Sequence, residues 1–205
     1  MFMHSNANQL PGCTVSIFGA VASHVWPWTV AALPVVVACG VLLHFTYARS
    51  GRNRVVAVFA PVNESLWEHL KMAYWPLVAY TVFELVVAAG PPSGLLAARA
   101  AGFVVTAVSM LTLSAALTAT LPRPGLRGQL LRDGMIFVVS VILGLLACEV
   151  LLGQLGLVPD RIGAALLALP AAVFAVTTFA PPHTPLFEDQ ITGGYGTPTD
   201  RGQRR

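Results

Sequence analysis

Residues 135–156, MIFVVSVILGLLACEVLLGQLG, are almost entirely apolar and contain one charged side chain, Glu149. A helix rises about 1.5 Å per residue, so this run can cross the roughly 30 Å apolar core of a bilayer. Further apolar runs of similar length lie at 28–47, 72–90, 94–119 and 162–180. The sequence therefore predicts an all-α integral membrane bundle of about five transmembrane helices.

The composition excludes a soluble domain. The chain has 205 residues, of which 56% are hydrophobic and only 10% are charged, and its mean hydropathy is +0.71. Soluble domains carry about 25% charged residues. The length also excludes a transporter of two six-helix halves, which needs about twice as many residues at roughly 20 per span. A small multi-pass membrane protein is the class that fits.

Basic side chains are distributed unevenly between the two sides of the predicted bundle. The side that has only two of them carries Arg99 and Arg161. The other side carries ten: Arg49, Arg52, Arg54, Lys71, Arg123, Arg127, Arg132, Arg201, Arg204 and Arg205. By the positive-inside rule the ten-charge side is cytoplasmic. We therefore expect a protein of the cell membrane with its N-terminus outside and its C-terminus in the cytoplasm.

The segments outside the predicted spans differ in character. The run at 15–25 is too short to cross a bilayer, so it is expected to lie in the interface or to extend the first helix. The last nine residues are polar and basic. The chain is divided accordingly into an interfacial segment 1–27, a five-helix domain 28–180, a motif-bearing tail 181–196 packed on the cytoplasmic face, and a disordered basic tail 197–205.

The first polar motif, PVNESLWEHLK at residues 61–71, directly precedes the second span. Ser65 and Glu68 match the S-x-x-E capping box that starts a helix. On that helix Glu64, Glu68 and Lys71 share one face, and His69 lies on the adjacent one. The motif thus places two carboxylates and an imidazole together at the membrane surface.

The second polar motif, PPHTPLFEDQITGGYG at residues 181–196, follows the last span. Its prolines end the helix, and its glycines are typical of a tight turn. An exposed tail does not need a leucine and two aromatic residues, so we expect the segment to fold back onto the bundle. This would bring His183, Glu188 and Asp189 near the first motif.

These two motifs together resemble the paired signatures of a family of small prokaryotic integral membrane proteins known only as a domain of unknown function. The resemblance extends from the first helix to Gly196. It implies a multi-pass membrane fold and a role for both motifs. It implies no activity, cofactor or catalytic residue.

The residue types of the motifs point to acid/base or metal chemistry. Histidine and carboxylate side chains bind Zn²⁺, Mn²⁺ or Fe²⁺, and imidazole can also exchange protons near neutral pH. No established metalloenzyme spacing such as HExxH is present, so a structural hydrogen-bond network and ligand binding without chemistry stay open. The candidate catalytic residues are Glu64, Glu68, His69, His183 and Asp189; the candidate ligands of a divalent metal are His69, His183 and Glu68; Asn63 and Lys71 are candidate ligand-binding residues, Lys71 as an anion anchor.

Three charged residues, Glu84, Arg99 and Glu149, fall inside predicted spans at similar depth. An unpaired charge at a helix centre costs about 2.5–3.5 kcal/mol on insertion, so Arg99 is expected to pair with one or both carboxylates. The group is a candidate ligand-binding site or ion relay, and equally a clamp between helices. His44, near the end of the first span, is interpreted as an interfacial hydrogen-bonding residue rather than a ligand.

These observations leave three functional hypotheses. The first is a membrane enzyme, hydrolytic and metal-assisted or acid/base in mechanism, acting on a lipid or lipid-linked substrate at the cytoplasmic face. The second is a small transporter or permeation protein that uses Glu84, Arg99 and Glu149, and the third is a non-catalytic scaffold. The expected partners are the lipid bilayer and a lipid-linked or small-molecule substrate, with no nucleic acid.

Overall fold

The computed structural model describes residues 12–88, 90–120 and 125–197. Within these ranges the chain forms helices and no strands, which confirms the predicted all-α class. Five helices are long and apolar enough to cross a membrane, as expected. The expectations for residues 1–11 and 198–205 lie outside the described residues. The helices are α1 Gly12–Arg49, α2 Arg54–Phe59, α3 Leu66–Val87, α4 Leu95–Thr120, α5 Leu126–Leu155 and α6 Asp160–Phe179.

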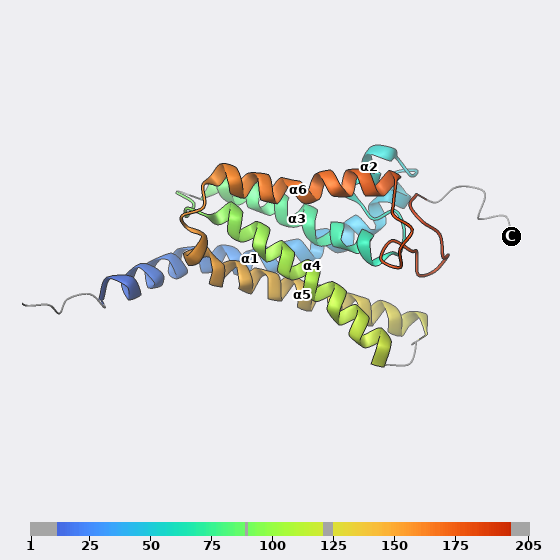
Figure 1. Cartoon of the computed structure of the whole chain (residues 1–205), viewed down its shortest axis with the longest axis horizontal. Helices are drawn as coiled ribbons and strands as arrows, with labels where there is room; N and C mark the ends of the chain where they lie inside the picture. Colours follow the sequence, from blue (N-terminus) through green and yellow to red (C-terminus); the bar gives the residue numbers. More distant parts are fainter. Residues whose placement is uncertain (1–11, 89, 121–124, 198–205) are drawn as a thin grey trace, which may run out of the picture.

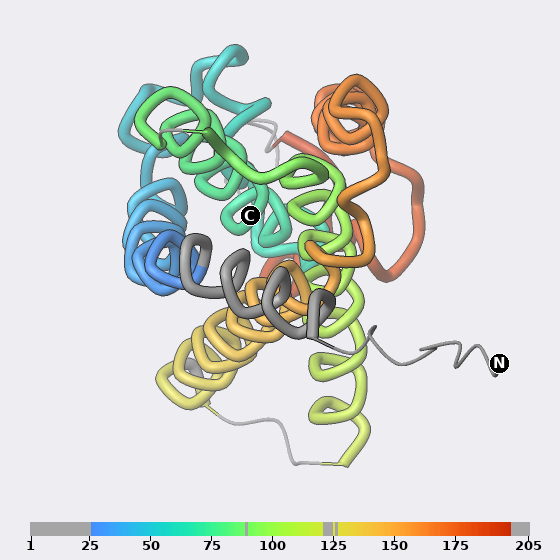
Figure 2. Tube along the Cα trace, turned by 90° about the vertical axis from the view of Figure 1, so that its left-hand side faces the viewer, coloured from blue at the N-terminus to red at the C-terminus, as the bar shows by residue number. Residues whose placement is uncertain are grey.

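Helix α3 occupies the centre of the bundle. It contacts α1, α4 and α6, and it lies between α1 and α6 when the bundle is viewed along its length (Figure 2). In the apolar 18-residue stretch of α3, 56% of the residues are buried, whereas 22% are buried in the corresponding stretches of α1 and of α6. The residues at the start of α3 are therefore fixed by neighbours on several sides.

One end of the bundle gathers the last turn of α1, helix α2, the start of α3 and residues 180–197 (Figure 1). We call this the motif end, because both sequence motifs lie there. Helices α4 and α5 diverge from α1 and α3 toward this end (Figure 1). A large cavity, described below, lies between these four helices.

Helix α3 begins at Leu66, earlier than the span expected at 72–90. The Ser65 side chain accepts a hydrogen bond from Glu68 N at 3.3 Å, as the capping motif predicts. The return bond of a capping box is absent, because Glu68 Oε2 instead accepts from Val62 N at 3.0 Å. The cap thus also holds the chain that leads into α3.

Helices α4 and α5 pack closely through facing glycines. A Cβ atom on Gly102 would lie 2.7 Å from Gly144 O, and one on Gly144 would lie 2.5 Å from Gly102 O. Only residues without a side chain allow this backbone approach, which is a common way of joining membrane helices. The two glycines therefore allow the backbones of α4 and α5 to lie in direct contact.

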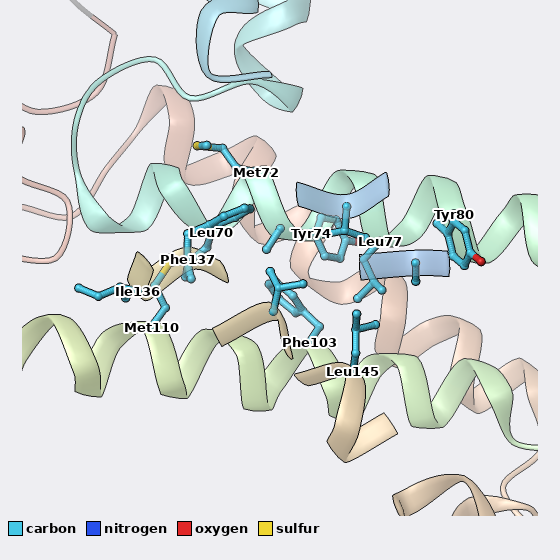
Figure 3. Close-up of a cluster of buried hydrophobic side chains, with 14 of the residues drawn as sticks. Leu70, Met72, Tyr74, Leu77, Tyr80, Phe103, Met110, Ile136, Phe137 and Leu145 are labelled. Atoms are coloured by element: carbon cyan, nitrogen blue, oxygen red, sulfur yellow. The ribbon is translucent and has the colours of Figure 1, made fainter. Parts of the chain in front are cut away.

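The core lies where α3 faces α4 and α5. Tyr74 and Leu77 of α3 point toward Phe103 of α4 and Leu145 of α5 (Figure 3). Tyr74 also donates a hydrogen bond to Leu167 O of α6 at 2.6 Å. Many large apolar side chains on the outer faces are exposed, as expected of helices that face lipid.

Candidate functional site

Three side chains from different parts of the chain meet at the motif end. His44 comes from the last turns of α1, Glu64 from the segment before α3, and His69 from the first turn of α3. Nε2 of His44 lies 3.5 Å from Glu64 Oε1, and Nε2 of His69 lies 3.5 Å from Glu64 Oε2. We call these three residues the His–Glu cluster. Within the described parts of the chain, they form the one group of three or more His, Cys, Asp or Glu residues close enough to share a metal ion.

The ring of His69 is held by the backbone of its own helix. Its Nδ1 lies 2.8 Å from Ser65 O, and a carbonyl oxygen only accepts hydrogen bonds. Nδ1 therefore carries a hydrogen, and in the neutral ring the lone pair lies on Nε2, which faces Glu64. The N-terminal cap of α3 thus fixes both the orientation of the ring and its neutral tautomer.

The ring of His44 makes fewer hydrogen bonds than that of His69. Its Nδ1 is buried and, among the described residues, has no hydrogen-bond partner. Its ring lies against that of His69, with the centroids 5.7 Å apart. The sequence analysis interpreted His44 as an interfacial hydrogen-bonding residue, which does not explain why its Nδ1 is buried without a partner among the described residues. The structure places the ring beside Glu64 and His69.

The His–Glu cluster lies on the wall of a large cavity. The cavity has a volume of about 690 Å³ and is bounded by α1, α3, α4, α5 and residues Gln190 and Ile191. Its volume falls in the range of small-molecule sites, roughly 300–1,000 Å³. Much of its wall is apolar, including Val37, Val41, Met110 and Phe137. The site therefore consists of the polar His–Glu cluster beside a cavity whose wall is largely apolar.

Glu68 and Lys71, two of the predicted site residues, lie in a separate buried network. Lys71 Nζ donates to Glu68 Oε2 at 2.7 Å, to Ala57 O at 3.1 Å and to Thr178 Oγ1 at 2.5 Å. The three N–H groups of the ammonium are thus used, and they connect α2, α3 and α6. Neither residue lines the large cavity. Their arrangement is that of a structural tie, with no free donor for an anion.

Asn63 and Asp189 shape the chain around the site. Asp189 Oδ1 accepts from Ile191 N at 2.9 Å and from Thr192 N at 3.3 Å, and Oδ2 accepts from Thr192 Oγ1 at 2.7 Å. Asn63 Nδ2 donates to Gly196 O at 3.0 Å. Both side chains are occupied in holding residues 181–197 in place.

The second motif returns to the start of α3. Trp67 N donates to Leu186 O at 3.1 Å, and the rings of Trp67 and Phe187 lie 4.8 Å apart. His183, however, is exposed and stacks on Tyr195 at 4.6 Å. The structure therefore does not bring His183 and Glu68 into one group with His69, and the three predicted metal ligands lie in three different surroundings.

The charged residues inside the spans form a second polar group. Arg99 Nη2 donates to Glu84 Oε2 at 2.7 Å, and both side chains are buried, so the expected ion pair is present. Glu149 accepts a hydrogen bond from Thr29. Nε and Nη1 of Arg99 have no hydrogen-bond partner among the described residues. A small cavity of about 10 Å³ adjoins Arg99 and shares no lining residue with the large one.

The sequence analysis did not predict that His44 lies beside Glu64 and His69. The signal available was topological, because a short connection makes the end of one span and the start of the next neighbours in space. His44 near the end of the first span and His69 before the second could have been paired on that basis. The contact between their rings also depends on α2 and on the Ser65 cap, and a hydropathy pattern reveals neither of these.

Comparison with known proteins places the chain in a family. The profile of a family of unknown function, DUF6512, matches residues 20–197, which include all five spans and both motifs. The chain matches no curated protein and no solved structure. The chain therefore belongs to the DUF6512 family, whose function is unknown.

Proposed function

We propose that the protein is a membrane enzyme that hydrolyses a lipid or lipid-linked substrate at the His–Glu cluster. The observation that carries this proposal is the position of the cluster on the wall of the apolar cavity. An amphipathic substrate would place its polar group at His44, Glu64 and His69. Its hydrocarbon part would lie against Val41, Met110 and similar side chains.

The residues supply the elements of acid/base hydrolysis. With its Nδ1 hydrogen held by Ser65 O, His69 has its Nε2 lone pair available to take a proton from water. As this O–H bond breaks, the water oxygen bonds to the acyl or phosphoryl centre of the substrate. Glu64 stabilises the imidazolium that forms. The imidazolium then returns its proton to the departing oxygen, which restores neutral His69.

The cavity also suggests how the substrate arrives. It lies where α4 and α5 diverge from α1 and α3, so an amphiphile can reach it from the bilayer (Figure 1). The positive-inside rule assigns the motif end to the cytoplasm, and hence the cavity to the inner leaflet. Thr192→Cys and Leu157→Cys, each made in a chain whose native Cys13, Cys39 and Cys148 are replaced by alanine, test this assignment with an impermeant maleimide in intact cells. Labelling is expected only at position 157.

Transport is the second candidate function. Buried charges within a membrane often mark ion pathways, and Arg99 has two nitrogens without partners among the described residues. The enzyme is favoured because the cavity beside Arg99 and the large cavity share no lining residue. A scaffold would use the Lys71 network but would not need the His–Glu cluster.

Lipid conversion tests the enzyme hypothesis. We would reconstitute the full chain in nanodiscs of total membrane lipid extract and compare lipids by mass spectrometry before and after incubation. Wild type is expected to form a hydrolysis product that His69→Gln does not form. His183→Gln is the matched control, because His183 lies exposed on Tyr195. Unchanged lipids with wild type, or loss of the product in the control alone, would contradict the proposal.

A further inference from the structure

The contact between His69 and Glu64 brings two acceptors together. Ser65 O takes the Nδ1 hydrogen of His69, so a neutral ring turns its Nε2 lone pair toward Glu64 Oε2, 3.5 Å away. Two lone pairs at this separation repel unless a hydrogen or a cation lies between them. A hydrogen carried by either residue or by a bridging water would relieve the repulsion, and so would a cation bound by both residues.

The spacing of the cluster fits a bound ion. Ligand atoms about 2.0–2.1 Å from a tetrahedral Zn²⁺ lie about 3.4 Å from one another. The nitrogens of His44 and His69 each lie 3.5 Å from an oxygen of Glu64, and the ligand atoms of all three residues lie within 4.8 Å of one another. The longest of these separations would have to shorten by up to about 1.4 Å for the three side chains to coordinate one tetrahedral ion.

The surroundings of the rings also fit a metal site. Histidine ligands in metalloproteins usually donate their second ring nitrogen to a carbonyl or carboxylate, as His69 does to Ser65 O. His44 differs, because its buried Nδ1 has no such partner among the described residues. Both histidine side chains are 22% exposed and Glu64 is 36% exposed, so an ion has access to them.

We propose that His44, Glu64 and His69 bind a divalent transition metal, with Zn²⁺ as the best match. Two imidazoles and one carboxylate are a ligand set typical of catalytic zinc and of non-haem iron. Three protein ligands leave coordination positions open, and these would face the large cavity. The inference deepens the proposed function and rests on it only for the role of the ion. With the ion bound, Nε2 of His69 would be a ligand rather than the base, and the ion would activate the water.

A metal-binding titration of the full chain in detergent tests the inference. After treatment with a chelator and its removal, wild type is expected to bind one Zn²⁺ per chain by calorimetry. His44→Ala and His69→Ala are expected to weaken the affinity at least a hundredfold. Co²⁺ added in place of Zn²⁺ is expected to give a visible absorption band with wild type and not with these variants.

Two further variants make the test specific. Glu64 lies outside the helices and is partly exposed, so Glu64→Gln is expected to fold normally and still to bind Zn²⁺ less tightly. His183→Ala removes an exposed histidine of the second motif and is expected to bind like wild type. Absence of Zn²⁺, Mn²⁺ and Fe²⁺ binding in wild type, or equal binding by Glu64→Gln and wild type, would overturn the inference.

The outcome for the metal is separable from that for the enzyme. Zinc binding that depends on the cluster, with no lipid conversion by the metal-loaded protein, would retain the metal site and reject the hydrolase. Lipid conversion by chelator-treated protein at an unchanged rate would retain the hydrolase and reject the metal site. A hydrogen between Nε2 of His69 and Glu64 would then account for their contact.

Discussion

Glu64 and Glu68 belong to one motif, are four residues apart, and lie in opposite surroundings. Glu68 is 3% exposed and accepts hydrogen bonds from Lys71 and Val62, in a network that uses every N–H of the ammonium. Glu64 is partly exposed and faces two imidazoles at the edge of a large cavity. A polar group whose hydrogen bonds are all made within the protein stabilises the fold, whereas a group with unused hydrogen-bonding capacity can bind a ligand.

Removal of the Lys71 ammonium should have the largest effect on stability. Lys71→Met leaves Glu68 as a buried carboxylate without its counter-charge, and breaking a buried pair in this way costs about 3–5 kcal/mol. Thermal and denaturant unfolding in detergent, followed by circular dichroism, measures the loss. The double variant Glu68→Gln/Lys71→Met is the control and should be more stable than the single one. A single variant as stable as wild type would remove the contrast between the two glutamates.

Replacement of the buried Arg99 should have the second-largest effect on stability. Arg99→Met leaves the Glu84 carboxylate unpaired within the bundle, at a cost of about 2.5–3.5 kcal/mol. The same unfolding measurement applies. Arg161→Met is the matched control, because Arg161 is exposed at the start of α6 and its replacement should change stability by less than about 0.5 kcal/mol. Equal stability of the two variants would show that the ion pair does not hold the helices together.

A smaller and local effect is expected at Asp189. Asp189→Ala removes the acceptor of three hydrogen bonds, which should weaken the turn at residues 189–194 by about 1–2 kcal/mol. Amide hydrogen exchange should rise there, with the midpoint of global unfolding nearly unchanged. Glu188→Ala, at the neighbouring position, serves as the control. If exchange rises throughout the bundle instead, the second motif contributes to global stability.

The smallest stability effect should come from Glu64→Gln. Glu64 is partly exposed and lies outside the helices, so the free energy of unfolding should change by less than about 0.5 kcal/mol. The same variant should nevertheless lose Zn²⁺ affinity and lipid conversion. A small loss of stability in Glu64→Gln, beside the large loss expected when Glu68 is left without Lys71, would support the distinction between the two glutamates. A Glu64→Gln protein that unfolds readily would place Glu64 among the structural residues.

The candidate site was partly predictable from the sequence. The residue types of the first motif identified Glu64 and His69 as chemical candidates, but helical spacing alone put Glu68 and Lys71 beside them. The direction in which each side chain points depends on Val62, Ala57 and Thr178, which come from other elements. Spacing within one helix cannot show which face meets a cavity and which meets a neighbouring helix.

Hydropathy, capping and the cost of isolated charges are properties of short segments, so the amino-acid sequence predicted the five spans, the Ser65 cap and a buried carboxylate partner for Arg99. The packing of the helices selected Glu84 as that partner, brought His44 to Glu64 and His69, and brought Lys71 to Thr178. Apart from Glu64 and His69, the residues in contact come from different parts of the chain. These contacts depend on how the helices pack and diverge, and no local pattern encodes that arrangement.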